Sequence, residues 1–263
     1  MVRTLLNDVP QLIVAVVFVS AIVCLTLGAL SLASRYLSSW REHGATEVVL
    51  GVSAMGMTLF ALVLAFVVVN LYSDYTSATA DVTDEANALG ALVQDARAFP
   101  PPAQRAVNRA VAGYVQEVRD HEFRALAEGD ADPRADARAI GVVDALQSYS
   151  PRTETERSFY SAATDQLNLF LGERENRVAK AETEIPSPLL GLLIFLAIVT
   201  IAVSFLIRTN RRSVDITLIV VVAVIIASGM LTALILQYPY SGAIAVKSDP
   251  LVEGPLAHLR ARG

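Results

Sequence analysis

The sequence is poor in the residues that most often carry chemistry. Among its 263 residues there is one cysteine, Cys24, and there are three histidines. A single cysteine excludes a disulfide within the chain and any CxxC redox or zinc motif. A glycine-rich phosphate-binding loop and a nucleophile elbow are also missing from the sequence. We therefore disfavour an enzyme, and we expect no cofactor.

One pair of residues has the spacing of metal ligands. Glu117 and His121 are one turn apart on a predicted helix. Two ligands without a third carboxylate or histidine at a fitting distance make a weak metal site. A solvated helix face is the favoured interpretation, and no metal site is predicted.

The sequence also lacks a concentrated basic segment. Between residues 73 and 186 there are 20 acidic and 12 basic residues, which gives this segment a net charge of -8. Nucleic-acid phosphates attract a basic surface, so an acidic module of this size argues against them. We exclude nucleic acid as a partner.

Apolar residues are abundant. Hydrophobic residues make up 54% of the chain, and its mean hydropathy is +0.48. Four runs approach or exceed the roughly 20 residues that cross a bilayer. They contain no charged residue and no histidine, and they cover residues 12–33, 48–72, 189–207 and 216–236. The first run is too long for a cleaved secretory signal. Four transmembrane helices in a lipid bilayer are therefore predicted.

The segment between the second and third spans has the pattern of packed helices. Apolar residues recur at three- and four-residue spacing directly after span two: Ala78, Val82, Ala86, Leu89, Val93 and Ala96. Similar stripes predict helices over about 103–127, 132–149 and 153–181. An alternating strand pattern occurs nowhere in this segment.

Local signals mark the ends of these helices. Gly129 suits a helix end, and Asp132 followed by Pro133 is typical of a helix start. Thr153 and Glu156 have the spacing of a capping box. Each signal falls between two stripes, which supports separate helices.

We predict an all-α membrane protein with four transmembrane helices and an extramembrane antiparallel helical bundle inserted between spans two and three. The expected parts are a first transmembrane hairpin, a helical module, a second transmembrane hairpin, and an interfacial turn with a tail: residues 1–72, 73–186, 187–237 and 238–263. The chain has no proline between Glu47 and Pro100. We therefore expect one unbroken helix to leave the membrane, and a second unbroken helix to return to it near Ile185.

The short loops predict the orientation in the membrane. Arginines gather in the loop between spans one and two and in the turn between spans three and four: Arg35, Arg41, Arg208, Arg211 and Arg212. By the positive-inside rule these loops are cytoplasmic, and the module and termini are outside. Four basic residues beside spans three and four oppose this orientation: Arg174, Arg177, Lys180 and Lys247.

Span two is rich in small and weakly polar residues. These allow close packing with another helix, or they line a narrow path between copies of the protein. Packing is the favoured interpretation, but a path between copies remains open. The candidate pore-lining residues are Ser53, Met57, Thr58, Asn70 and Asp74.

A carboxylate and an amide follow in the helix after span two. Glu85 and Asn87 lie beside Ala86, Ala88 and Gly90, where backbones can approach closely. We expect them to bond to the returning helix or to a neighbouring subunit. A structural role is favoured over a ligand site, because buried polar groups are usually paired.

Three motifs together resemble the bacterial bestrophin-like membrane family. Residues 85–90, Glu-Ala-Asn-Ala-Leu-Gly, are similar to the family's EANAIG motif. Ile185-Pro186 precedes span three, and residues 239–242, Pro-Tyr-Ser-Gly, resemble the end of its DRPFSG motif. Gln237 and Tyr238 stand where the family has Asp-Arg. The residues that match these motifs, Glu85, Asn87, Gly90, Pro186, Pro239 and Gly242, are expected to have structural roles.

The resemblance implies a function that composition does not reveal. Bestrophins are pentameric anion channels with four spans in each subunit, a pore lined by the second span and a large cytoplasmic helical region. The resemblance therefore predicts that the chain is a homo-oligomeric channel for ions in the bacterial inner membrane. The alternative is a membrane-anchored sensor or scaffold whose helical module binds a partner or solute.

Overall fold

The structure, a computed structural model, describes residues 3, 7, 9–36, 46–182, 185–206, 211–242, 244–253 and 256–257. Over these residues the chain forms helices and turns and contains no β-strand. The all-α prediction is confirmed. The two arginine-bearing loops of the topology prediction lie largely outside the described residues, at 37–45 and 207–210, as do Arg260 and Arg262.

The chain divides into two compact units. The membrane unit comprises residues 8–73 and 184–237, and the helical unit comprises residues 1–7, 74–183 and 238–263. The tail after span four and the first residues of the chain thus belong to the helical unit. The two units are described separately below.

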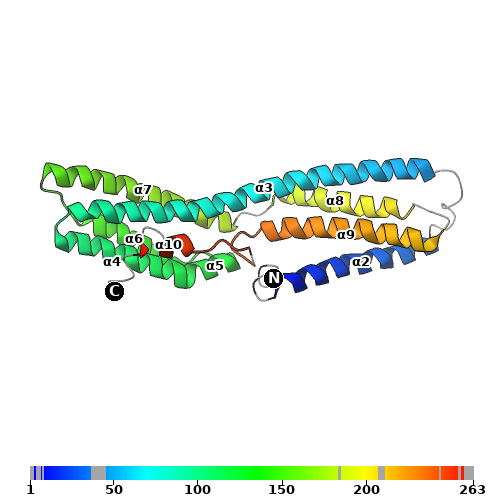
Figure 1. Ribbon diagram of the computed structural model, residues 1–263, viewed down its shortest axis with the longest axis horizontal. Helices are drawn as coiled ribbons and strands as arrows, with labels where there is room; N and C mark the ends of the chain where they lie inside the picture. The colour runs from blue at the N-terminus through cyan, green and yellow to red at the C-terminus, as the bar shows by residue number, and fades with distance from the viewer. Residues whose placement is uncertain are drawn as a thin grey trace. The chain divides into compact units, whose positions relative to one another are not determined.

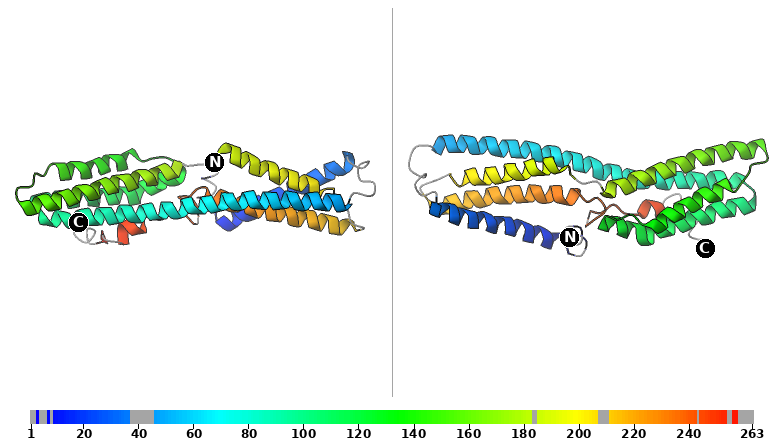
Figure 2. Two further views of the ribbon diagram at one scale, coloured as in Figure 1. Left: turned by 90° about the horizontal axis from the view of Figure 1, so that it is seen from above. Right: turned by 180° about the vertical axis from the view of Figure 1, so that it is seen from behind.

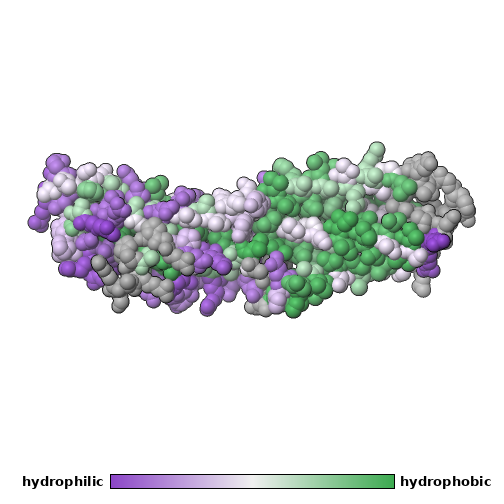
Figure 3. Space-filling view, in the orientation of Figure 1, coloured by the Kyte–Doolittle hydropathy of each residue, from purple (hydrophilic) through white to green (hydrophobic). Residues whose placement is uncertain are grey.

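The membrane unit contains four helices that are long and apolar enough to cross a bilayer. They are α2 (Gln11–Tyr36), the first half of α3 (Thr46–Asp95), α8 (Ser187–Ser204) and α9 (Arg212–Leu236). α9 contacts both α2 and α8. Hydrophobic residues cover the visible face of this unit (Figure 3). The four predicted spans are confirmed, with apolar surfaces suited to lipid.

The interior of the membrane unit is small. Phe60 of α3 packs with Leu193 of α8 and Ile226 of α9, and a second cluster joins Val67 and Ala233. Gly229 of α9 leaves room for Leu64, since a β-carbon at this glycine would lie 2.4 Å from Leu64 Cδ2. Close contact at a small residue is the usual way in which helices associate in lipid.

The helical unit packs the second half of α3 with the helices that follow it (Figures 1 and 2). These are α4 (Pro101–Glu117), α5 (Phe123–Glu128), α6 (Pro133–Gln147) and α7 (Glu154–Glu182), with the short α10 (Asp249–Glu253) in the tail. The predicted stripe of α3, from Ala78 to Ala96, is buried in the core of this unit. Burial of these apolar side chains drives the bundle together.

The predicted helix ends are confirmed. Gly129 ends α5 with a φ of 93°, a left-handed conformation that glycine adopts without strain. The Asp132 side chain accepts a hydrogen bond from the backbone N–H of Arg134 at 2.9 Å. At the start of α7, the Glu156 N–H donates to Thr153 Oγ1, and the Thr153 N–H donates to Glu156 Oε2. This reciprocal pair is the expected capping box.

Two expectations about helix continuity differ from the structure. α3 is one helix, but the returning helix is not continuous, because α7 ends at Glu182 and a new helix begins at Ser187. Pro186 precedes it with an extended ψ of 127°, and Pro188 occupies its first turn. Proline lacks an N–H and disfavours a helical conformation in the residue before it, so a helix stops here. The second difference lies in the helix predicted over 103–127, which contains a π-helical turn at Val118–Glu122.

The turn after span four is ordered, as expected. The Ser241 N–H donates to the Tyr238 carbonyl at 3.0 Å, and Gly242 has a φ of 80°. Ser241 Oγ donates to the Ala127 carbonyl at 2.7 Å, and Asn7 Nδ2 donates to the same oxygen at 3.2 Å. The Gly242 N–H in turn donates to Asn7 Oδ1. The tail is thereby joined to the end of α5.

Candidate functional site

The described residues contain no group of three or more histidine, cysteine, aspartate or glutamate side chains that could hold a metal. His121 Nδ1 lies 3.0 Å from Glu117 Oε1, and 52% of the histidine side chain is exposed. The two side chains are neighbours across one turn of the helix, with Glu117 only 14% exposed.

The most unusual feature of the helical unit is a buried arginine. The side chain of Arg177 on α7 is fully buried, and its Nε donates to Glu85 Oε2 of α3 at 2.6 Å. Its Nη2 donates to Glu122 Oε2 at 2.6 Å and to the Tyr114 hydroxyl at 3.1 Å. A buried charge is tolerated only with such partners. Arg177 therefore ties α3 and α4 to α7 and binds the π-helical turn.

Glu122 is shared between two arginines. Its Oε1 accepts from Arg174 Nη2 at 2.8 Å, and Arg174 also reaches Asp136 of α6 at 2.6 Å. The Tyr114 hydroxyl donates to Glu85 Oε1 at 2.5 Å. We call the five side chains Glu85, Tyr114, Glu122, Arg174 and Arg177 the charge cluster.

Burial and neighbouring charges shift the pKa values of Tyr114 and Arg177 in the charge cluster upward. Burial raises the pKa of Tyr114 well above its usual value, and the charge of Glu85 raises it further, so the phenol stays protonated. Burial alone would lower the pKa of Arg177, but the charges of Glu85 and Glu122 help to raise it well above its usual value. The arginine thus stays charged and the tyrosine neutral at any physiological pH.

A second ion pair joins the same two helices. Lys180 of α7 donates to Asp81 and, at 2.6 Å, to Ser77 Oγ on α3. Ser77, Asp81 and Glu85 are spaced four residues apart, so they form one polar stripe along α3. This stripe fixes how α3 is rotated against α7.

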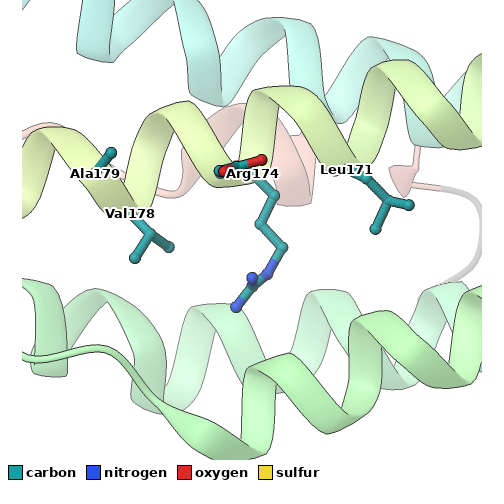
Figure 4. Close-up of a pocket in the computed structure, with 5 residues that line it drawn as sticks. Leu171, Arg174, Val178 and Ala179 are labelled. Carbon is teal, nitrogen blue, oxygen red and sulfur yellow. The ribbon is translucent and has the colours of Figure 1, made fainter.

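An open pocket of about 440 Å³ lies beside the charge cluster, lined by Leu171, Arg174, Glu175, Val178 and Ala179. Figure 4 shows Arg174 extending from α7 between Leu171 and Val178. The arginine is already bonded to two carboxylates. These carboxylates therefore offset the positive charge that Arg174 brings to the pocket.

The candidate pore-lining residues do not share one face. Ser53 and Met57 are half-buried, whereas Thr58, Asn70 and Asp74 are exposed. Two of the exposed side chains bond to their own helix: Thr58 Oγ1 donates to the Ala54 carbonyl and Asn70 Nδ2 to the Phe66 carbonyl, each at 2.8 Å. At about 100° per residue, the five positions are spread around the helix.

The motif residues separate into buried and exposed positions. Glu85, Gly90 and Pro239 are buried, Gly242 is half-buried, and Asn87 and Pro186 are exposed. Glu85 bonds to the returning helix, one of the two partners expected for it.

Sequence reasoning missed the partners of Glu85. Tyr114 falls in the apolar spacing of the helix predicted over 103–127, and the sequence presents Arg177 only as a basic residue near span three. A clue was present, because Tyr114, Val118, Glu122 and Leu126 are four residues apart and Glu122 interrupts the apolar stripe. All four are buried.

Comparison with known proteins identifies relatives of this architecture. Residues 17–251 match the family described as Bestrophin-like domain. Two variants of a bacterial bestrophin homologue from Klebsiella pneumoniae share the fold, each with a TM-score of 0.70 over 94% of this chain. The matches cover 99% and 98% of those chains at 13% and 12% identity. A crystal structure described as a membrane protein matches with a TM-score of 0.69 at 12% identity, over 94% of this chain and 97% of the other. Among curated proteins, none matches the sequence.

Proposed function

Because this chain belongs to the bestrophin-like family, we propose that it forms a homo-oligomeric anion channel in which α3 lines the axis. The proposal includes the bacterial inner membrane as its location and transport rather than catalysis as its activity. Family membership favours it over the sensor or scaffold alternative. One observation carries it: the part of α3 that its own chain leaves uncovered in the membrane unit has a face of small residues beside a face of large ones.

The covered face of α3 is narrow. Phe60, Val67 and Leu71 are buried against α8 and α9. On the other side, two faces are exposed. One consists of small residues, Gly51, Ala54, Thr58, Ala61 and Ala65, and the other of large ones, Met55, Leu59, Leu62 and Phe66. Exposed small residues at this spacing allow another helix to approach closely.

The positions of these two faces fit a ring of identical helices. At about 100° per residue, the small face and the large face are centred roughly 90° apart. In a closed ring, each helix meets its two neighbours on faces roughly 90–110° apart for four or five copies. The large residues of one α3 then pack against the small residues of the next. The line midway between the two faces then points to the axis of the ring, and Phe60 lies on the opposite side of α3.

This arrangement selects among the candidate pore-lining residues. Thr58 lies near the midline, together with Gly51, Leu62 and Val69. Ser53 and Met57 lie on the side of Phe60 and pack within the chain. Span two has no charged side chain between Glu47 and Asp74, so the pore has no fixed carboxylate that would repel anions.

The proposal is tested by chloride flux into liposomes that contain the purified protein, with native mass spectrometry of the same sample. Thr58→Trp narrows the pore at its midline, and we expect it to reduce flux by at least about tenfold. Leu25→Trp is the matched control, because Leu25 on α2 is 73% exposed and distant in sequence from α3. A monomer without chloride flux would refute the channel, and equal flux in both variants would refute the assignment of Thr58.

A further inference from the structure

The π-helical turn between α4 and α5 lies where the charge cluster meets the tail. The Phe123 N–H donates to the Val118 carbonyl, a bond between residues five apart that defines this turn. Such a turn adds one residue to a helix, and π turns inside α-helices often occur at functional sites. Of its five residues, Val118 and Glu122 are buried.

We propose that Glu122 holds this turn, so that its ion pairs with Arg174 and Arg177 set the register of α5 and thereby the docking of the tail. Both carboxylate oxygens of Glu122 are used, one by each arginine, at 2.8 Å and 2.6 Å. The two arginines lie one turn apart on α7 and pull the same side chain toward that helix. No other residue of the turn forms an ion pair with α7 among the described contacts.

The alternative register is a continuous α-helix through residues 117–128. If the π-helical turn converts to α-helix, α5 rotates by about 100° about its axis and shifts by about 1.5 Å along it. Ala125 then takes the place of the buried Leu126. The Ala127 carbonyl moves as well, and it is the oxygen that accepts from Ser241 Oγ and from Asn7 Nδ2.

The tail depends on this carbonyl. Gly242 is held by Asn7, whose amide also binds Ala127. Tyr240 packs its ring against Phe123, the first residue of α5, with ring centroids 6.0 Å apart. Rotation of α5 therefore breaks the two contacts that the tail makes with it, by Ser241 and by Tyr240, and also the bond from Asn7 to Ala127. The charge cluster and the tail are coupled through one turn of helix, and this coupling does not require channel activity.

Hydrogen–deuterium exchange on the purified full chain tests the proposal. Glu122→Gln weakens the pairs with Arg174 and Arg177, so the π-helical turn is no longer held. We therefore expect the backbone amides of peptides covering residues 123–129 and 238–246 to exchange about tenfold faster. Asp120→Asn is the matched control, since Asp120 lies in the same turn but its ion pair is with the exposed Arg119 and not with α7. It should leave exchange unchanged.

A deletion separates a register change from simple loss of stability. Removing Arg119 from Glu122→Gln shortens the segment by one residue, so that an uninterrupted α-helix returns Leu126 and Ala127 to their places. We expect protection of both peptides to be restored. Unchanged exchange in Glu122→Gln would overturn the proposal, as would a double variant that stays unprotected. If Glu122→Gln fails to accumulate, accumulation of the double variant alone supports the register change, and failure of both refutes it.

Discussion

At the scale of single residues, the helical unit depends on the pairing of Arg177. Its guanidinium is fully buried among Glu85, Glu122 and Tyr114, and the Phe123 ring centroid lies 5.4 Å from its Cζ. A buried pair is costly to break, because the remaining charge loses its partner without regaining water. The effect of a substitution should therefore depend on which charge is left behind.

We expect Glu85→Gln to destabilise the helical unit by about 3–5 kcal/mol, the usual cost of leaving one member of a buried pair unpartnered. Denaturant unfolding in detergent, followed by circular dichroism, measures this loss. Asp84→Asn is the matched control, because Asp84 is the preceding residue and is exposed. Equal stability of the two variants would show that the ion pair of Glu85 contributes little.

In the membrane unit, the contact between Gly229 and Leu64 gives a second expectation. Gly229→Ala places a methyl group 2.4 Å from Leu64 Cδ2, so one side chain must move. We expect a loss of about 1–3 kcal/mol, typical of overpacking, and recovery of part of it when Leu64→Ala is added. Thermal unfolding of the single and double variants measures the coupling. Gly191→Ala, where no atom lies within 4 Å of the added carbon, should be neutral, and strictly additive effects would contradict the contact.

At the scale of elements, the start of α7 shows how a local signal fixes a helix boundary. Thr153→Ala removes the hydroxyl that accepts from the Glu156 N–H. We expect a loss of about 1 kcal/mol, as for other N-caps, whereas the exposed Thr155→Ala should cost much less. Chemical unfolding measured by circular dichroism compares the two. If both variants are equally stable, the capping box does not stabilise α7.

The stability that Glu156 contributes to this capping box should depend on pH. The backbone N–H of Arg152, together with that of Thr153, donates to Glu156 Oε2 and holds the pKa of its carboxyl below the usual 4.5. A carboxylate with a lowered folded-state pKa contributes stability above its usual pKa and loses it as the pH falls through the folded value. We expect the stability difference between the wild type and Glu156→Gln to shrink below about pH 4.5. A difference that is constant from pH 7 to pH 3 would contradict this assignment.

The helices and their ends could be predicted from the sequence, but most contacts between the helices could not. Caps and apolar stripes act over a few residues, so Gly129, Asp132 and Thr153 marked helix ends correctly. The partner of Glu85 lies 92 residues away, and no local pattern connects two such positions. The π-helical turn was also missed, because its cause is the pull of two distant arginines on Glu122.

At the scale of the whole molecule, the charge cluster changes how the basic residues bear on membrane topology. Arg174, Arg177 and Lys180 were the main evidence against the arginine loops being cytoplasmic. All three are paired with carboxylates of the helical unit. Their positions are explained by packing, so they carry less weight as orientation signals. The remaining asymmetry favours cytoplasmic loops and a helical unit on the outer side.

This orientation is opposite to the one that the bestrophin resemblance implies, in which the large helical region is cytoplasmic. Labelling of intact cells with a membrane-impermeant maleimide, in a Cys24→Ala background, distinguishes the two. We expect Ser150→Cys, at an exposed position between α6 and α7, to be labelled without permeabilisation. Asn210→Cys, in the arginine-bearing loop, should be labelled only after permeabilisation. The reverse pattern would place the helical unit inside the cell, and would mean that the loop arginines do not set the topology of this chain.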